Sequence, residues 1–109
     1  MAKVMQFKIS VEGLDLPPQD VERTNQELVS IVMHNIMHSY AKNGLRKDER
    51  NQYYRIVDVM DEAVKMKADE IELEDQDAGF LKKCAREAQM IPNRLLQRIE
   101  DAIEAIKDR

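Results

Sequence analysis

Two histidines have the spacing of a metal site. His34 and His38 stand four residues apart in the segment VMHNIMHSY, so on a helix both imidazoles could reach one metal ion. Zinc proteases use H-E-x-x-H, in which the glutamate beside the first histidine is the general base. Here Asn35 holds that position, and an amide cannot take a proton from water. The sequence contains no other histidine to serve as a third nitrogen ligand.

A helical wheel places the two histidines away from the apolar stripe. At about 100° per residue, Val32 and Ile36 cluster on one arc. His34 and His38 lie roughly opposite, on the same side as Glu27. We therefore expect histidines that face solvent or a partner, and no metal site within one chain. A metal site formed by Glu27, His34 and His38 together with a second chain is the alternative hypothesis.

The run DEIELEDQD is a dense group of carboxylates. A calcium-binding loop needs the pattern D-x-[DN]-x-[DN]-G, and no register of this run provides it. With Gly79 at the sixth position, Gln76 and Ala78 would occupy ligand positions. The alternation instead predicts a strand whose apolar residues, Ile71 and Leu73, face inward. The glutamates of that strand then face solvent: Glu70, Glu72 and Glu74.

No other pattern typical of catalysis occurs in the chain. Cys84, the single cysteine, lies on the apolar stripe of its predicted helix, which indicates a buried structural thiol. With three glycines, the sequence contains neither a phosphate-binding loop nor a dinucleotide-binding loop. These features predict a protein that has no cofactor and is not an enzyme.

Composition and charge restrict the class of protein further. The chain has 109 residues, 43% of them hydrophobic and 35% charged, as expected for one globular domain over residues 1–109. Its net charge of −4 gives no general attraction to nucleic acid or anionic membranes. The sequence lacks both the apolar run of a signal peptide and the roughly 18 apolar residues of a membrane span. A single cysteine excludes an internal disulfide and favours the cytoplasm.

Hydrophobic periodicity predicts the element order β-α-α-β-α-α, an α+β fold that is mainly α, with four amphipathic helices packed against two short strands. The first strand alternates inward Met5, Phe7, Ile9 and Val11 with outward Gln6, Lys8 and Ser10. The stripe of the first helix comprises Val21, Leu28, Val29, Val32, Ile36 and Tyr40. We expect that helix to begin at Gln19 or Asp20 and to end before Gly44. We expect Asp48 to be the N-cap of the second helix and Asp75 that of the third. Pro92 should be the first residue of the fourth helix.

A strand followed by two helices is also the order of ribbon-helix-helix repressors, which are dimers that read the major groove with a two-stranded ribbon. In this alternative, the outward residues of the first strand would contact DNA: Gln6, Lys8 and Ser10. The intervening segment GLDLPPQD and the long first helix depart from the short steps of that family. A DNA-binding transcriptional regulator is therefore the alternative function.

Two successive segments, separated by residues 64–69, resemble short bacteriophage-encoded or prophage-encoded proteins. DERNQYYRIVDVMDEA is followed by EIELEDQDAGFLKKCAREA, in which an Arg/Tyr-bearing helix leads to the pattern I-x-L-x-D-x-D-x-x-F-L-K-K. The resemblance extends from Asp48 to about Ile106 and assigns no role to any single residue. It implies a protein-binding role without a cofactor, either in virion assembly or in binding and inhibiting a host protein.

The sequence thus predicts a non-enzymatic module for protein–protein interaction, in the host cytoplasm or the virion. Two short strands leave free edges, and pairing across a symmetric dimer would cover them. The apolar face of the predicted helix over residues 48–68 is also broad, because it includes Val59 and Met66. Both features predict a homo-oligomer that also binds another protein.

Overall fold

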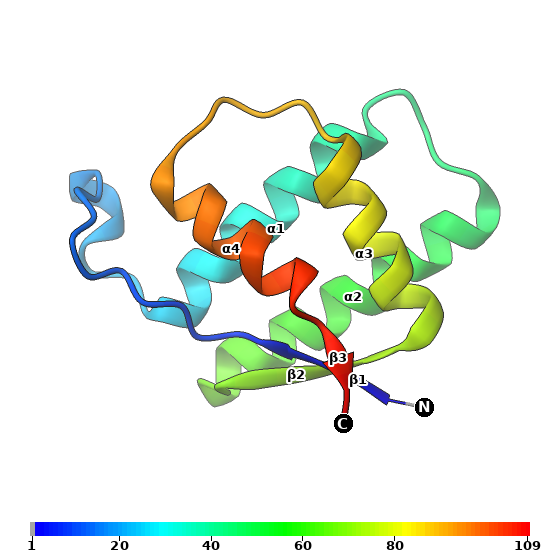
Figure 1. Cartoon of the computed structure of the whole chain (residues 1–109), viewed down its shortest axis with the longest axis horizontal. Coiled ribbons are helices and arrows are strands. Elements are labelled where there is room, and N and C mark those ends of the chain that lie inside the picture. Colours follow the sequence, from blue (N-terminus) through cyan, green and yellow to red (C-terminus); the bar gives the residue numbers. More distant parts are fainter. Residues whose placement is uncertain (1) are drawn as a thin grey trace.

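The computed structural model describes residues 2–109 and contains four α-helices, a short 3-10 helix and three strands (Figure 1). The elements are β1 (Ala2–Gln6), η1 (Pro18–Asp20), α1 (Asn25–Ala41), α2 (Lys47–Met66), β2 (Glu70–Glu74), α3 (Asp75–Glu87), α4 (Arg94–Glu104) and β3 (Lys107–Asp108). The predicted order β-α-α-β-α-α is confirmed, and the chain has a mainly helical α+β fold. The short strand β3 is an addition to that prediction.

The strands form one antiparallel sheet in the order β2-β1-β3, which lies across one end of the helices (Figure 1). Along β1 and β2, Lys3 lies opposite Leu73 and Met5 opposite Ile71. Met5, Ile71 and Leu73 are buried, as the sequence pattern predicted for the inward face. Since β1 is the central strand, β2 and β3 form the two edges of the sheet.

β3 is held by its neighbour rather than by hydrophobicity of its own. Val4 of β1 lies opposite Lys107, and the N–H of Arg109 donates to the carbonyl oxygen of Ala2 at 3.2 Å. A polar segment of two residues has no strand periodicity that a sequence pattern could detect.

The N-terminal alternation of buried and exposed residues continues beyond the end of the strand. β1 ends at Gln6, although we expected the strand to reach Val11. Phe7 and Ile9 are nevertheless buried. The N–H of Ile9 donates to the side-chain oxygen of Asn25 at 2.7 Å, so a residue of α1 takes the place of a neighbouring strand there.

α1 begins later than the sequence pattern predicted. We expected a start at Gln19 or Asp20, but that segment forms only the 3-10 turn η1. The Thr24 hydroxyl accepts the N–H of Glu27 at 3.2 Å, and the Glu27 carboxylate accepts the N–H of Thr24 at 3.3 Å. This reciprocal capping box fixes the start of α1. Val21 therefore lies outside the helix and is exposed instead of joining the apolar stripe.

The other helices begin within two residues of the expected positions. Asp48 and Asp75, which we expected as N-caps, lie inside the first turns of α2 and α3. Pro92, which we expected as the first residue of the last helix, precedes the actual cap, Asn93. The side-chain oxygen of Asn93 accepts the N–H of Leu96 at 2.8 Å, and this bond sets the start of α4.

One continuous core lies between the sheet and the helices and includes residues from both ends of the chain. Methionine and aliphatic side chains dominate it. The side chains that are almost entirely buried are Met5, Phe7, Val29, Met33, Ile36, Met37, Ile56, Met60, Leu81, Cys84, Ile99 and Ile103.

The turn from α2 into β2 has an unfavourable backbone conformation. Lys67, the C-cap of α2, has a φ of 51° in the left-handed region, where glycine is favoured. We predict that Lys67→Gly raises the free energy of unfolding by about 0.5–1 kcal/mol, because glycine adopts this conformation without steric cost. Urea denaturation followed by circular dichroism measures the change. The control Lys65→Gly, inside the last helical turn, should lower stability by a similar amount; a loss of stability in Lys67→Gly as well would contradict the prediction.

Candidate functional site

The described surface has a groove of about 740 Å³ between α2 and the free edge of β2. Its floor is apolar, and most of its rim is acidic. The apolar residues are Val59, Ala63, Met66 and Ala68 with Ile71, and the charged residues are Asp58, Glu62, Glu70, Glu72 and Arg109. Val59, Ala63 and Met66 recur at helical spacing, so they form one stripe along α2.

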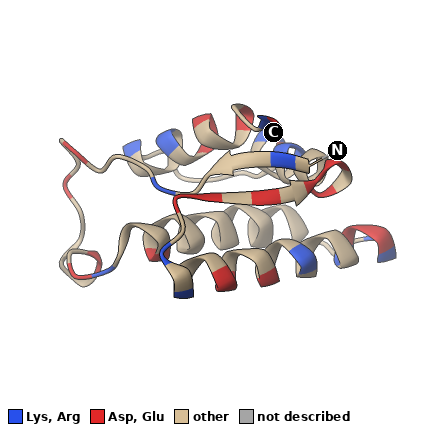
Figure 2. Ribbon diagram, turned by 90° about the horizontal axis from the view of Figure 1, so that it is seen from below, with Lys and Arg blue, Asp and Glu red and all other residues tan. Residues whose placement is uncertain are grey.

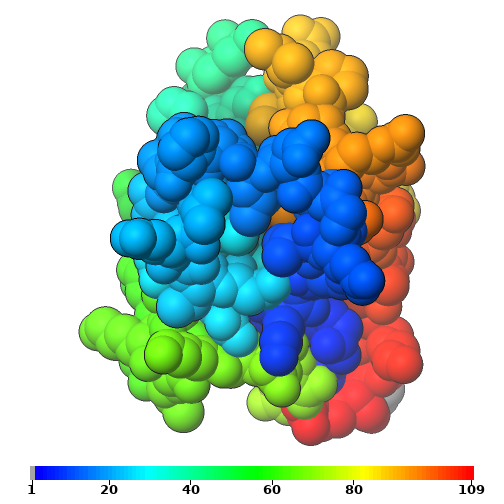
Figure 3. All heavy atoms as spheres, turned by 90° about the vertical axis from the view of Figure 1, so that its left-hand side faces the viewer, coloured from blue at the N-terminus to red at the C-terminus, as the bar shows by residue number. Residues whose placement is uncertain are grey.

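The stripe exists because α2 has a wide apolar face. Ile56 and Met60 are fully buried in the core, whereas Met66 is 69% exposed. The chain then turns back through Lys67 into β2, which brings the end of α2 beside the sheet. Figure 3 shows the green segment that joins α2 to β2 projecting from the lower part of the molecule. Val59 and Met66, which the sequence marked as widening the apolar face, both line this groove.

The backbone of β2 is unpaired on the side away from β1. The N–H of Phe7 donates to the carbonyl oxygen of Asp69 at 2.8 Å. Phe7 and Asp69 are therefore a hydrogen-bonded pair that continues the ladder between β1 and β2. Hydrogen-bonded pairs alternate along an antiparallel ladder, so Ile71 and Leu73 also direct their backbone groups to β1. The backbone groups that point outward are the N–H and C=O groups of Glu70 and Glu72 and the N–H of Glu74, whose carbonyl belongs to the first turn of α3. Of the strands that the structure describes, none pairs with this outer edge.

The glutamate side chains of β2 lie on the outer face of the sheet, as the sequence predicted. They alternate with the buried Ile71 and Leu73, and in Figure 2 the glutamate positions appear as red bands along the ribbon of β2. Arg109 reaches two of them, with Nη2 2.7 Å from Glu70 and Nε 2.5 Å from Glu72. These contacts raise the pKa of Arg109 above its usual value, first through the hydrogen bond to Glu70. The groove nevertheless has more carboxylates than cations along its rim.

The predicted histidine pair is not part of this groove. His34 is partly buried on α1 and His38 is exposed, with the exposed Asn35 between them. Glu27, the third member of the hypothetical metal stripe, is engaged in the capping box of α1. Within residues 2–109, no group of three or more histidine, cysteine or acidic side chains is arranged to hold a metal ion. The two-chain metal site stays a hypothesis.

The candidate DNA-contacting residues are exposed, but their strand already has a neighbour on each side, β2 along its length and β3 at Lys3 and Val4. Gln6 is the last residue of β1, and Lys8 and Ser10 follow the strand. β1 has β2 on one edge and β3 on the other. A two-stranded ribbon shared with a second copy requires a free edge on the same strand. The observed sheet order therefore does not favour the DNA-binding alternative.

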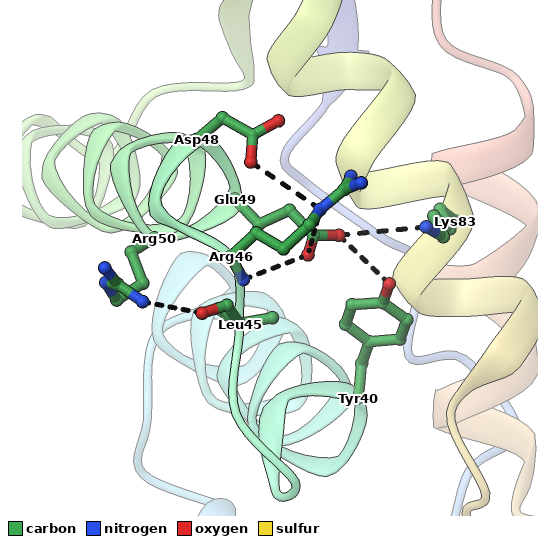
Figure 4. Close-up of polar contacts among 7 residues, drawn as sticks. All are labelled: Tyr40, Leu45, Arg46, Asp48, Glu49, Arg50 and Lys83. Carbon is green, nitrogen blue, oxygen red and sulfur yellow. Dashed lines mark hydrogen bonds and ion pairs between the residues drawn. The ribbon is translucent and has the colours of Figure 1, made fainter.

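The sequence pattern did not indicate a polar cluster that joins α1, α2 and α3 (Figure 4). Glu49 is buried, and its carboxylate accepts the Tyr40 hydroxyl at 3.1 Å and the N–H of Arg46 at 3.3 Å. Lys83 Nζ lies 3.7 Å from the same carboxylate. Burial alone raises the pKa of Glu49, but the hydrogen bonds from Arg46 and Tyr40 and the charges of Arg46 and Lys83 outweigh it, so the pKa is lower than usual.

Cys84 is fully buried, as predicted. Burial, reinforced by the nearby carboxylates of Glu49 and Glu87, raises the pKa of the thiol to about 12. The thiol therefore stays protonated at neutral pH, and a protonated thiol is a poor nucleophile.

A second buried carboxylate connects α2 to α3. Asp77 is 3% exposed and binds Arg55 through two hydrogen bonds, from Nη2 at 2.7 Å and from Nε at 3.0 Å. Asp77 lies in the first turn of α3, and the sequence gave no sign of its partner. Both buried carboxylates therefore hold helices together away from the groove.

No helix among residues 2–109 has the length and apolar content needed to cross a membrane. Comparison with protein-family models, with curated proteins and with solved structures gave no match. The groove between α2 and β2, with the unpaired edge of β2 inside it, is therefore identified from the structure of this chain and not from a related protein.

Proposed function

We propose that this chain is a non-enzymatic protein-binding module and that the groove between α2 and β2 is its binding surface. The observation that carries the proposal is the unpaired edge of β2 beside an apolar floor that includes the 69% exposed side chain of Met66. Exposed strand edges bind proteins by adding a strand, and flexible methionines adapt to different apolar partners. The floor supplies apolar contact area, and the edge supplies hydrogen bonds.

The proposed partner at this edge is a different protein and not a second copy. If two β2 strands paired across a dimer axis, glutamate would face glutamate, and like charges directly opposite each other destabilise a sheet. The homo-oligomer expected from the sequence stays a prediction and would need another surface. A role in phage assembly or in binding a host protein, in the host cytoplasm or the virion, agrees with the resemblance to short phage proteins and is part of the proposal.

We predict that Met66→Glu abolishes partner binding, because it places a carboxylate on the apolar floor beside an acidic rim. The immobilised chain is incubated with lysate of the cells that express it, and retained proteins are quantified by mass spectrometry. The control is Ile91→Glu, since Ile91 is 87% exposed and lies outside the groove. A specific protein should be retained by the wild type and by Ile91→Glu but not by Met66→Glu. Equal retention by all three proteins, or none above a blank matrix, would refute the proposed surface.

A further inference from the structure

We infer that the groove receives an extended protein segment in which apolar and basic residues alternate, and that this segment pairs antiparallel with β2 as an added strand. The inference rests on the proposed protein-binding function and specifies the chemistry of the partner. Three features of the groove support it: free backbone groups, an apolar floor on one side and a row of carboxylates on the other.

The backbone of β2 provides a regular pairing edge. Glu70 and Glu72 direct their N–H and C=O groups away from β1, and Glu74 directs its N–H there, while its carbonyl belongs to the first turn of α3. These groups recur at every second residue, about 6.8 Å apart, and an extended chain has the same repeat. A helix satisfies its backbone groups internally and would leave this edge unpaired. The occupant that fits the edge is therefore a strand.

The floor of the groove selects apolar side chains at alternate positions of that strand. Side chains directly opposite each other on paired strands lie on the same face of a sheet. A residue opposite Ile71 would therefore turn toward α2. There Val59, Ala63 and Met66 form the apolar floor. The next residue, opposite Glu72, would turn to the outer face of the sheet.

The outer positions of the added strand select cations. The side chains they meet are Glu70, Glu72 and Glu74. On the opposite rim, Asp58 and Glu62 add two more carboxylates, whereas Arg109 is the one cation among the described lining residues. Lysine or arginine on the added strand would pair with this row, and aspartate or glutamate would be repelled. Because these pairs are exposed, the selectivity should weaken as salt is added.

A second copy of this chain fits the groove less well than a basic strand. Its β2 would place glutamates opposite glutamates. Its β3 is two residues long, and its free backbone edge belongs to Asp108, because Lys107 and Arg109 direct their backbone groups to β1. Pairing of β3 with β2 would therefore place Asp108 opposite a glutamate and would turn Lys107 and Arg109 toward the apolar floor.

The probe for this inference is a short labelled peptide in which valine and lysine alternate. The backbone nitrogens of its valines are methylated, which prevents the peptide from pairing with itself. Binding to the full chain is followed by fluorescence anisotropy in about 50 mM salt, where exposed charges are only partly screened. Three changed peptides serve as controls. One has glutamate in place of lysine, one has serine in place of valine, and one carries methyl groups on the backbone nitrogens of its lysines. Each should bind about tenfold or more weakly, because each removes one of the three features.

Variants of the chain locate the bound peptide. Glu72→Lys should weaken binding of the lysine peptide about tenfold and favour the glutamate peptide, because it reverses the charge in the middle of the row. Glu22→Lys makes the same charge change at an exposed residue outside the groove and should leave binding nearly unchanged. In NMR exchange experiments, the amides of Glu70, Glu72 and Glu74 should be protected when the peptide is bound.

Equal binding of the glutamate or serine peptide would overturn the alternation of basic and apolar residues in the bound segment. Equal binding of the peptide with methylated backbone nitrogens at its lysines would overturn strand addition. A concentration-dependent oligomer that Met66→Glu abolishes would assign the groove to a second copy and would overturn it as well. If Met66→Glu loses a captured protein while no peptide binds, strand addition fails and the proposed function stands. If both experiments fail, both proposals are rejected.

Discussion

Replacing Phe7 by alanine is expected to lower the free energy of unfolding by about 3–5 kcal/mol. The side chain is 0% exposed and belongs to the continuous core, so its removal leaves a cavity that the tight packing around it cannot fully close. A domain of this size is stable by roughly 5–15 kcal/mol in total. The substitution should therefore remove a large part of the stability, as measured by urea denaturation with circular dichroism.

The neighbouring substitution Lys8→Ala is the matched control, because Lys8 is exposed and follows Phe7 in the same extended segment. It should change stability by less than about 0.5 kcal/mol. A loss below about 1 kcal/mol in Phe7→Ala would contradict the prediction. It would mean that the segment after β1 is not docked in the core as described.

The alternation along the N-terminal segment predicted which side chains are buried, but it did not predict how far the strand extends. Met5, Phe7 and Ile9 are inward because a period of two is a property of the extended chain itself. Where pairing stops depends on the neighbouring chain. At Ile9, the hydrogen-bond partner is the side chain of Asn25, and a residue so distant in sequence cannot be inferred from alternation.

The start of α1 was predictable, since the signal was present in the sequence. T-N-Q-E at residues 24–27 is a capping-box pattern, and it outweighs the weaker signal of an acidic residue after two prolines. The arrangement of the sheet was harder to predict from the sequence. A strand of two polar residues gives no periodic signal, and the order β2-β1-β3 decides which edge remains open.

The candidate groove could be predicted in part. Val59 and Met66 were identified by the width of the apolar face of their helix, which is a local property of the sequence. Their position beside β2 requires the turn at Lys67 and the sheet order, and both are tertiary features. Glu49 gave no signal at all. In sequence it is one of several charged residues at a helix start, and its burial depends on Tyr40 and Lys83 from other helices.

Replacing Glu49 by glutamine is expected to lower stability by about 1–2 kcal/mol near neutral pH, because charge-assisted hydrogen bonds are replaced by neutral ones in a buried position. The size of the loss should depend on pH. The pKa of Glu49 in the folded chain is below its usual value of 4.5, so folding favours the charged carboxylate. That stabilisation is complete above the pKa that Glu49 has in the unfolded chain. It is lost as the pH falls through the lower pKa that Glu49 has in the folded chain.

The difference in stability between the wild type and Glu49→Gln should accordingly be constant above about pH 5 and shrink toward zero in stronger acid, where Glu49 itself is protonated. Urea denaturation at a series of pH values measures it. Glu22→Gln, an exposed glutamate outside the cluster, is the control and should follow the wild type throughout. A difference that stays constant into strong acid, or grows there, would show that the charge of Glu49 does not hold α1, α2 and α3 together.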